Sequence, residues 1–130
     1  MSSIFSKIVN GTIPAYIVAE DRLHIAILDA YPKVKGHVLV IPKKEVDYIF
    51  DISSYEYSEL WKFSKRVAKS MRKVIKCKRI AVAVVGLEVP LTHIHLLPLN
   101  SMSDFNFDQA SLKFSSSQMK SISDLIKSAI

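Results

Sequence analysis

Two histidines stand one residue apart in the segment Thr92-His93-Ile94-His95-Leu96. Its β-branched and apolar residues favour a strand, in which alternate side chains point to the same face. His93 and His95 therefore share one face, roughly 6.5–7 Å apart along the strand, while Ile94 and Leu96 point into the core. Because imidazole titrates near neutral pH, the pair can act as nucleophile and proton donor. It can equally provide two metal ligands, or make only structural hydrogen bonds.

The strands that would hold this pair are predicted from short β-rich runs bounded by turn residues. The last two runs are joined by Gly86-Leu87-Glu88-Val89-Pro90. This connection has hairpin length, so the two strands should pair antiparallel. We expect strands at 16–19, 24–28, 38–41, 80–85 and 91–97.

Helices are predicted on either side of these strands. A short one follows Ser2 or Ser3, either of which could cap it, and ends at Asn10-Gly11. A long one begins at Ser53, where Glu56 completes a capping-box pattern. Its apolar positions follow the 3.6-residue period of a helix that packs on a core; they are Tyr57, Leu60, Trp61, Val67, Ala68, Met71, Val74 and Ile75.

A third helix is expected over 117–130, which gives the order helix, strands, helix, strands, helix. Strands grouped apart from helices favour an α+β fold with a mostly antiparallel sheet. The length of 130 residues, without a repeat or a linker, predicts a single domain over 1–130.

Separated blocks of the chain resemble, in order, the histidine-triad (HIT) family of nucleotide-binding proteins. The blocks are Ile4-Phe5-Ser6-Lys7-Ile8 with Gly11-Thr12-Ile13-Pro14-Ala15, Ile27-Leu28-Asp29, Lys35-Gly36-His37-Val38-Leu39-Val40-Ile41-Pro42-Lys43-Lys44, and Gly86-Leu87-Glu88-Val89-Pro90 with the histidine segment up to Pro98. The resemblance covers residues 3 to about 100, whereas the tail over 101–130 carries only the C-terminal helix. It implies a five-stranded, mostly antiparallel sheet with a long helix, which joins the sheet of a second copy in a homodimer.

The family signature is His-φ-His-φ-His-φ-φ, where φ is an apolar residue. Here Leu91 stands in place of the first histidine, and Thr92 is polar where an apolar residue is usual. The resemblance implies that His93 attacks the α-phosphorus of a nucleoside phosphoramidate or a dinucleotide, which gives a nucleotidyl-histidine that water hydrolyses. It implies that His95 helps to hold the phosphate. It also implies that the backbone carbonyl of Leu91 accepts a hydrogen bond from the His93 ring and fixes its tautomer.

The same resemblance assigns a nucleotide-binding role to several residues. Asp29 would bind the ribose hydroxyls, and the loop residues Leu87, Glu88 and Val89 would bring backbone N–H groups to the phosphate. The base pocket would be lined by Ile4, Phe5, Ile8 and Ile27.

Two acidic residues depart from the family pattern. Glu45 stands where a further histidine often follows the Pro-Lys-Lys stretch, and Glu88 stands where a neutral phosphate donor is usual. We assign no chemistry to His24 or His37, for which we expect structural roles.

Composition limits the other functions. The net charge is +6, and nine of the eighteen Lys and Arg residues lie within 62–79. Such a run is typical of a solvated helix face, although it can also bind nucleic acid or anionic lipid. The longest apolar run, 80–85, is far shorter than the roughly 20 residues of a membrane span. We expect a cytoplasmic protein, since Lys7 interrupts any export signal and Cys77 is the single cysteine.

The leading hypothesis is a purine nucleotide hydrolase or phosphoramidase that acts through His93, without cofactor or metal. A first alternative is a nucleotide-binding member of the family with weak or no turnover, because Leu91 and Glu45 replace family histidines. A second is a metal protein that uses His93 and His95, although no third ligand is evident. A third is nucleic-acid binding through 62–79, which we do not expect because that face lacks interleaved aromatic residues.

Overall fold

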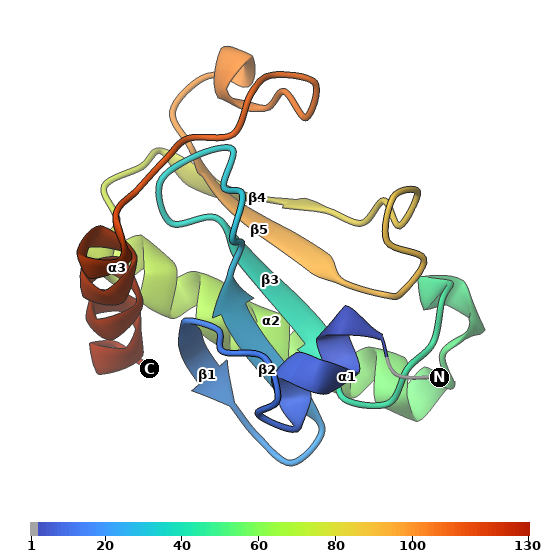
Figure 1. The fold of residues 1–130 in the computed structure, drawn as a ribbon. Coiled ribbons are helices and arrows are strands. Elements are labelled where there is room, and N and C mark those ends of the chain that lie inside the picture. Colours follow the sequence, from blue (N-terminus) through green and yellow to red (C-terminus); the bar gives the residue numbers. More distant parts are fainter. Residues whose placement is uncertain (1–2) are drawn as a thin grey trace.

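A five-stranded antiparallel sheet forms the centre of the molecule, whose computed structural model describes residues 3–130 (Figure 1). The order across the sheet is β1-β2-β3-β5-β4, and every neighbouring pair is antiparallel. The strands are β1 (Ile17–Glu20), β2 (His24–Leu28), β3 (Val38–Pro42), β4 (Arg79–Ala83) and β5 (Ile94–Leu99). The predicted α+β architecture is therefore confirmed.

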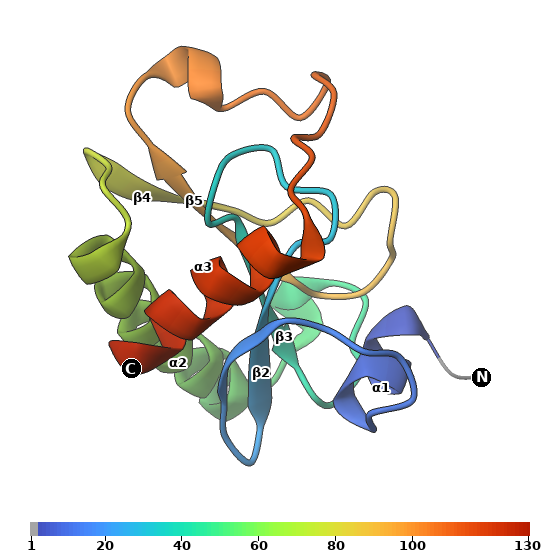
Figure 2. The same ribbon diagram turned by 60° about the vertical axis from the view of Figure 1, so that its left-hand side comes forward.

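The helices cover the two faces of this sheet unequally. The long helix α2 (Ser54–Val74) and the C-terminal helix α3 (Ser116–Ser128) pack on one face, where they bury the larger apolar core (Figure 2). The short helix α1 (Ile4–Val9) lies over the other face and covers a smaller apolar cluster. Two 3-10 turns, η1 (Ile49–Asp51) and η2 (Met102–Asp104), lie in the connections. No helix within residues 3–130 is long and apolar enough to cross a membrane.

Strand alternation places the histidines as the sequence pattern predicted. Ile94 and Leu96 are fully buried in the core under α2 and α3, so His93 and His95 face the opposite side. The strand begins at Ile94 rather than at the predicted residue 91, because the backbone before it pairs elsewhere. The N–H of Leu91 donates to the Val89 carbonyl, and the N–H of Thr92 donates to the Val46 carbonyl.

The helix starts follow the predicted caps. Ser3 caps α1 by accepting from the N–H of Ser6, whereas Ser2, the other candidate, lies outside the described residues. Ser53 caps α2 by accepting from the N–H of Glu56. The predicted capping box is only half formed, because the Glu56 carboxylate accepts from the Ser53 hydroxyl instead of the Ser53 backbone.

The cap of α2 generates a stability prediction. Ser53→Ala removes the acceptor for a backbone N–H in the first turn, so it should lower the free energy of unfolding by about 1 kcal/mol. Urea unfolding followed by circular dichroism measures this loss. Ser58→Ala, an exposed serine inside the same helix, is the matched control and should leave stability unchanged or slightly raised. Equal midpoints for the two variants would contradict the capping role.

Candidate functional site

His93 and His95 lie side by side on the face of the sheet that α1 partly covers. Their ring centroids are 4.9 Å apart, and each side chain is less than a tenth exposed. His95 is in register with Leu39 on the neighbouring strand β3, so the apolar cluster under α1 begins directly beside it. Both imidazoles are therefore packed on rigid elements, with only small edges open to a ligand.

The orientation of His93 is set by one backbone carbonyl. Its Nδ1 lies 2.6 Å from the carbonyl oxygen of Leu91. A carbonyl can only accept a hydrogen bond, so Nδ1 carries the proton and Nε2 carries a free lone pair. The edge of Phe5 from α1 packs against this ring, with centroids 5.2 Å apart. In the neutral tautomer that this bond selects, Nε2 of His93 has the lone pair that can attack an electrophile.

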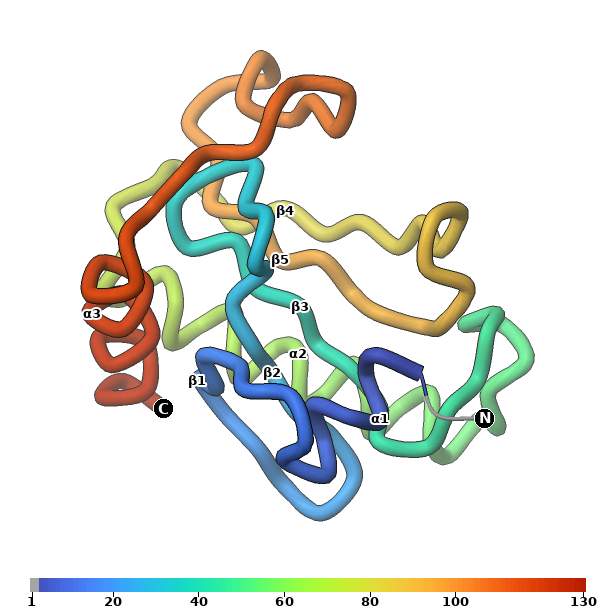
Figure 3. The backbone as a smooth tube through the Cα atoms, in the orientation of Figure 1, coloured from blue at the N-terminus to red at the C-terminus, as the bar shows by residue number. Residues whose placement is uncertain are grey.

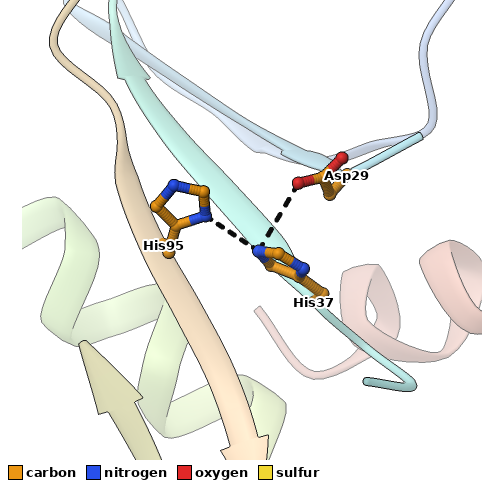
Figure 4. A group of neighbouring side chains, drawn as sticks. All are labelled: Asp29, His37 and His95. Carbon is orange, nitrogen blue, oxygen red and sulfur yellow. Dashed lines mark hydrogen bonds and ion pairs between the residues drawn. The ribbon is translucent and has the colours of Figure 1, made fainter. Parts of the chain in front are cut away.

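The orientation of His95 is set by a second histidine, His37, just before β3. The backbone N–H of Lys33 donates to Nδ1 of His37 at 3.1 Å, so the proton of neutral His37 must sit on Nε2. That nitrogen lies 2.9 Å from Nδ1 of His95 (Figure 4). The His95 Nδ1 therefore accepts, and its own proton is on Nε2. The backbone amide of Lys33 thus makes Nε2 of His95, the ring nitrogen that does not contact His37, a hydrogen-bond donor.

Burial keeps this pair of imidazoles uncharged. It lowers the pKa of His37 from 6.5 to about 3, with smaller contributions from the charges of His95, Lys33 and His93. Burial also lowers the pKa of His95 from 6.5 to about 4, with His93 as the second cause. Both rings are neutral at physiological pH, so the chain of donors and acceptors is maintained.

Asp29 stands beside His37 where β2 ends. Its Oδ1 accepts from the N–H of Tyr31 at 2.9 Å, and its Oδ2 lies 3.5 Å from Nε2 of His37. Burial raises the pKa of this carboxyl group, while the Tyr31 hydrogen bond and nearby positive charges oppose the change. The predicted ribose-binding carboxylate is therefore next to the histidines, although ribose binding itself stays a prediction.

Asp29, His37 and His95 also have the spacing of a metal-binding group, with one potential ligand atom from each within 4.8 Å of the others (Figure 4). The tautomers argue against that use. Nε2 of His37 carries a proton because its Nδ1 accepts from Lys33, so this nitrogen has no lone pair to offer. A metal ion bound at Nε2 of His37 would require the proton to move to Nδ1. That N–H would then face the backbone N–H of Lys33, and two donors cannot form a hydrogen bond. The alternative of a metal held by His93 and His95 meets a similar obstacle, because Nε2 of His95 is also protonated.

The residues predicted to line a base pocket are brought together in part. Phe5 and Ile27 are buried in the apolar cluster under α1, and Ile8, Val89 and Leu91 pack against it. The remaining members of that cluster are Ile25, Leu39 and Ile41.

Besides Asp29, three of the predicted nucleotide-binding residues lie outside this cluster. Ile4 is 52% exposed on the outer side of α1, and Leu87 is 88% exposed in the loop before β5. Glu88 is also exposed.

Glu45, for which the resemblance implied a position often held by histidine, is engaged with α1. Its carboxylate accepts a hydrogen bond from the Ser3 hydroxyl at the start of α1. This bond is the main reason that the pKa of Glu45 is lowered. Glu45 therefore ties α1 to the segment after β3.

The sequence predicted a structural role for His37 but not the hydrogen bond through which it orients His95. It is two residues before Leu39, whose side chain faces the smaller cluster, and it therefore shares that face. Alternation along the predicted strand 38–41 could have placed His37 on the same side as His95. The partner of His37 is 58 positions away in sequence, however, and only the pairing of β3 with β5 brings the two together.

Comparison with known proteins agrees with this geometry. The profile of the HIT domain family matches residues 10–102. An uncharacterized HIT-like protein of Methanocaldococcus jannaschii is 35% identical over 99 residues, which cover 73% of this chain and 77% of that protein. The adenosine 5'-monophosphoramidase hnt1 of Schizosaccharomyces pombe is 41% identical over 71 residues, 55% of this chain and 53% of that enzyme. A bis(5'-adenosyl)-triphosphatase of Dictyostelium discoideum is 29% identical, over 68% of this chain and 62% of that enzyme.

The fold is also that of solved relatives. A hypothetical histidine triad nucleotide-binding protein of Sulfolobus tokodaii superposes with a TM-score of 0.86 and 24% identity, over 98% of this chain and 91% of that chain. The family match spans most of this chain and includes His37, His93 and His95. The protein therefore belongs to the HIT domain family, whose members include nucleotide hydrolases.

Proposed function

We propose that the protein hydrolyses nucleoside phosphoramidates or dinucleotides through a nucleotidyl intermediate on His93. The proposal rests on a difference in protonation between Nε2 of His93 and Nε2 of His95. Nε2 of His93 has a lone pair, because its Nδ1–H is held by Leu91, whereas Nε2 of His95 carries a proton. A nucleophile and a hydrogen-bond donor thus stand side by side, as phosphoryl transfer requires.

The reaction would proceed in two steps. Nε2 of His93 attacks the α-phosphorus, the bond from phosphorus to the leaving group breaks, and the leaving amine or nucleotide departs with the electron pair and takes up a proton. Water then attacks the same phosphorus and releases a proton to the solvent, which balances the proton taken up by the leaving group. The bond to Nε2 breaks and returns the lone pair to His93. Throughout, Nε2–H of His95 donates to a phosphoryl oxygen, where it stabilises developing charge.

The nucleoside would lie against the face that α1 covers. We place the purine on the apolar cluster containing Phe5, Ile8 and Ile27, and the ribose at Asp29. This arrangement is supported by the position of Asp29 beside the histidines. The adenosine 5'-monophosphoramidase of S. pombe and the bis(5'-adenosyl)-triphosphatase of D. discoideum, to which this chain is similar, also favour adenosine compounds.

The alternative of a binding protein without turnover rests on Leu91. Its side chain packs with the apolar cluster and cannot supply an imidazole beside the phosphate. Its carbonyl still orients His93, so we favour slow turnover over none.

A homodimer is the proposed assembly. β4 is an edge strand that pairs only with β5 within residues 3–130, and Val82 on it is half-exposed. On α2, the indole N–H of Trp61 is buried without an acceptor within the same residues. A second copy that joins its sheet at this edge would cover the apolar side chains.

Three measurements test the proposal. First, His93→Ala should abolish hydrolysis of adenosine phosphoramidate and the acid-labile nucleotidyl adduct, which is detected by single-turnover incubation with a labelled adenylate donor. Leu91→His should speed hydrolysis by one or more orders of magnitude, because a positioned acid–base group contributes about 10²–10⁴ in rate. Wild-type turnover no faster than that of His93→Ala would identify a binding protein. A folded, nucleotide-binding Leu91→His that gains nothing would show that Leu91 does not limit the rate.

Second, Asp29→Ala should weaken binding of a purine nucleoside monophosphate by roughly 1.5–3 kcal/mol, the scale of a hydrogen bond to a charged group. Isothermal calorimetry measures the loss. Asp29→Asn is the matched variant, since its amide oxygen can still accept from Tyr31 and maintain the turn. Equal affinities for wild type and Asp29→Ala would remove Asp29 from the site.

Third, light scattering at micromolar protein concentration should give the mass of two chains, near twice 14.7 kDa. Val82→Lys, placed on the exposed side of the edge strand, should shift the mass towards one chain, because it puts a like charge opposite its symmetry mate. A monomeric wild-type mass would count decisively against the dimer.

A further inference from the structure

The chain after β5 returns across the site before it enters α3. We call residues 101–115 the strap. Figure 3 shows it looping away from the end of β5 and passing the turn between β2 and β3. Two hydrogen bonds fix it to that turn: Lys33 Nζ donates to the Gln109 carbonyl at 2.7 Å, and the Leu112 N–H donates to the Pro32 carbonyl at 2.8 Å. Nearly all of the strap lies beyond residue 102, where the family match ends.

One aromatic side chain of the strap reaches the histidines. The ring of Phe107 meets His95 edge-on, with centroids 5.0 Å apart and an interplanar angle of 70°. It also approaches His37, at 6.4 Å and 70°. Phe105 packs against the other side of Phe107, at 5.6 Å. Phe107 is 36% exposed, so about two thirds of its surface is covered in this position.

We propose that Phe107 is a positioning residue: it shields the hydrogen bond between His37 and His95 from water and so keeps the proton of His95 on Nε2. The catalytic part of this proposal rests on the proposed function, because it is there that Nε2–H of His95 donates to the phosphate. The structural part is independent of activity, because it concerns only the ionisation and tautomer of His95.

The hydrogen bond between Nε2 of His37 and Nδ1 of His95 survives only while His95 is neutral. A protonated His95 carries N–H groups on both ring nitrogens, so its Nδ1–H would face the Nε2–H of His37 and the bond would be lost. Burial is the largest cause of the low pKa of His95. Removal of a side chain that keeps water out should therefore raise the pKa of His95 towards the ordinary histidine value of about 6.5.

The charged and titratable groups around the pair do not substitute for that shielding. His93 faces His95 from the residues before β5, and Lys33 and His93 act on His37. Asp29, from the end of β2, is 3.5 Å from His37 and would favour a positive charge there. In the strap itself, Asp104 is hydrogen-bonded to the N–H groups of Asn100 and Ser101, and Asp108 is exposed.

Lys33 links the strap to the histidines in two ways. Its backbone N–H fixes the tautomer of His37, and its side chain holds the strap at Gln109. Lys33→Met keeps the first interaction and removes the second. The Lys33 charge acts on His37 and is not among the causes that shift His95. A change at His95 in this variant therefore reports the position of the strap.

The test is an NMR titration of the His95 ring in the full chain. In wild type, His95 should remain neutral down to about pH 4, whereas in Phe107→Ala its pKa should rise towards about 6.5.

The pH dependence of unfolding gives a second measurement. Because the pKa of His95 is depressed in the folded wild type, the stability that this group contributes is complete above pH 6.5 and is lost as the pH falls towards 4. Phe107→Ala should therefore unfold with less dependence on pH over this window.

Controls separate shielding from a general loss of structure. Met102→Ala, in the same strap but with a side chain 80% exposed, should leave the His95 titration unchanged. Phe107→Leu should restore most of the wild-type value, because it returns an apolar side chain. If Phe107→Ala does not fold, Lys33→Met answers the same question through the titration of His95.

A folded Phe107→Ala in which His95 titrates as in wild type would overturn the proposal. So would a Met102→Ala that shifts His95 as much as Phe107→Ala does. If the wild type proves inactive, the proposed function fails, but the titration still decides whether Phe107 shields the pair.

Discussion

The hydrogen bond from the Lys33 N–H to Nδ1 of His37 determines the tautomers of two histidines, His37 and His95. A backbone amide can only donate, so it forces the proton of His37 onto Nε2, and the next hydrogen bond passes this choice to His95. At the other histidine, a backbone carbonyl does the reverse and holds the proton of His93 on Nδ1. Two main-chain groups thus make two chemically identical side chains different: in the neutral rings, the proton is on Nδ1 of His93 and on Nε2 of His95.

The fold supplies the rigidity that this arrangement needs. Gly36, with φ of +83°, turns the chain immediately before His37, and a Cβ there would lie 3.4 Å from Ile75 Cγ1 and from Pro98 Cγ. The turn is therefore packed against the end of α2 and against β5. From it, β3 runs antiparallel to β5 in a register that brings Leu39 opposite His95. The tautomer of His95 thus depends on long-range strand pairing, although each hydrogen bond is local in space.

Sequence patterns predicted the parts of this structure that depend on near neighbours. The 24–28 strand follows from a short β-rich run, the inward faces of Ile94 and Leu96 follow from alternation, and the start of α2 follows from the cap at Ser53. The role of His37 could not be read in the same way, because it comes from pairing with a strand far along the chain. The strap was missed for a different reason. It has no periodic pattern, and backbone hydrogen bonds and one aromatic contact hold it in place.

The division between backbone and side-chain roles explains how Leu91 is compatible with an ordered site. Orientation of His93 needs only a carbonyl at this position, which every amino acid provides, so the leucine leaves the geometry intact. Its side chain packs into the apolar cluster with Phe5. In the proposed reaction, an alkyl group at this position would offer neither a proton nor a dipole to charge that develops on the phosphate. Leu91 would therefore act on the height of the barrier, whereas His37 and its backbone partner determine which tautomer of His95 is present.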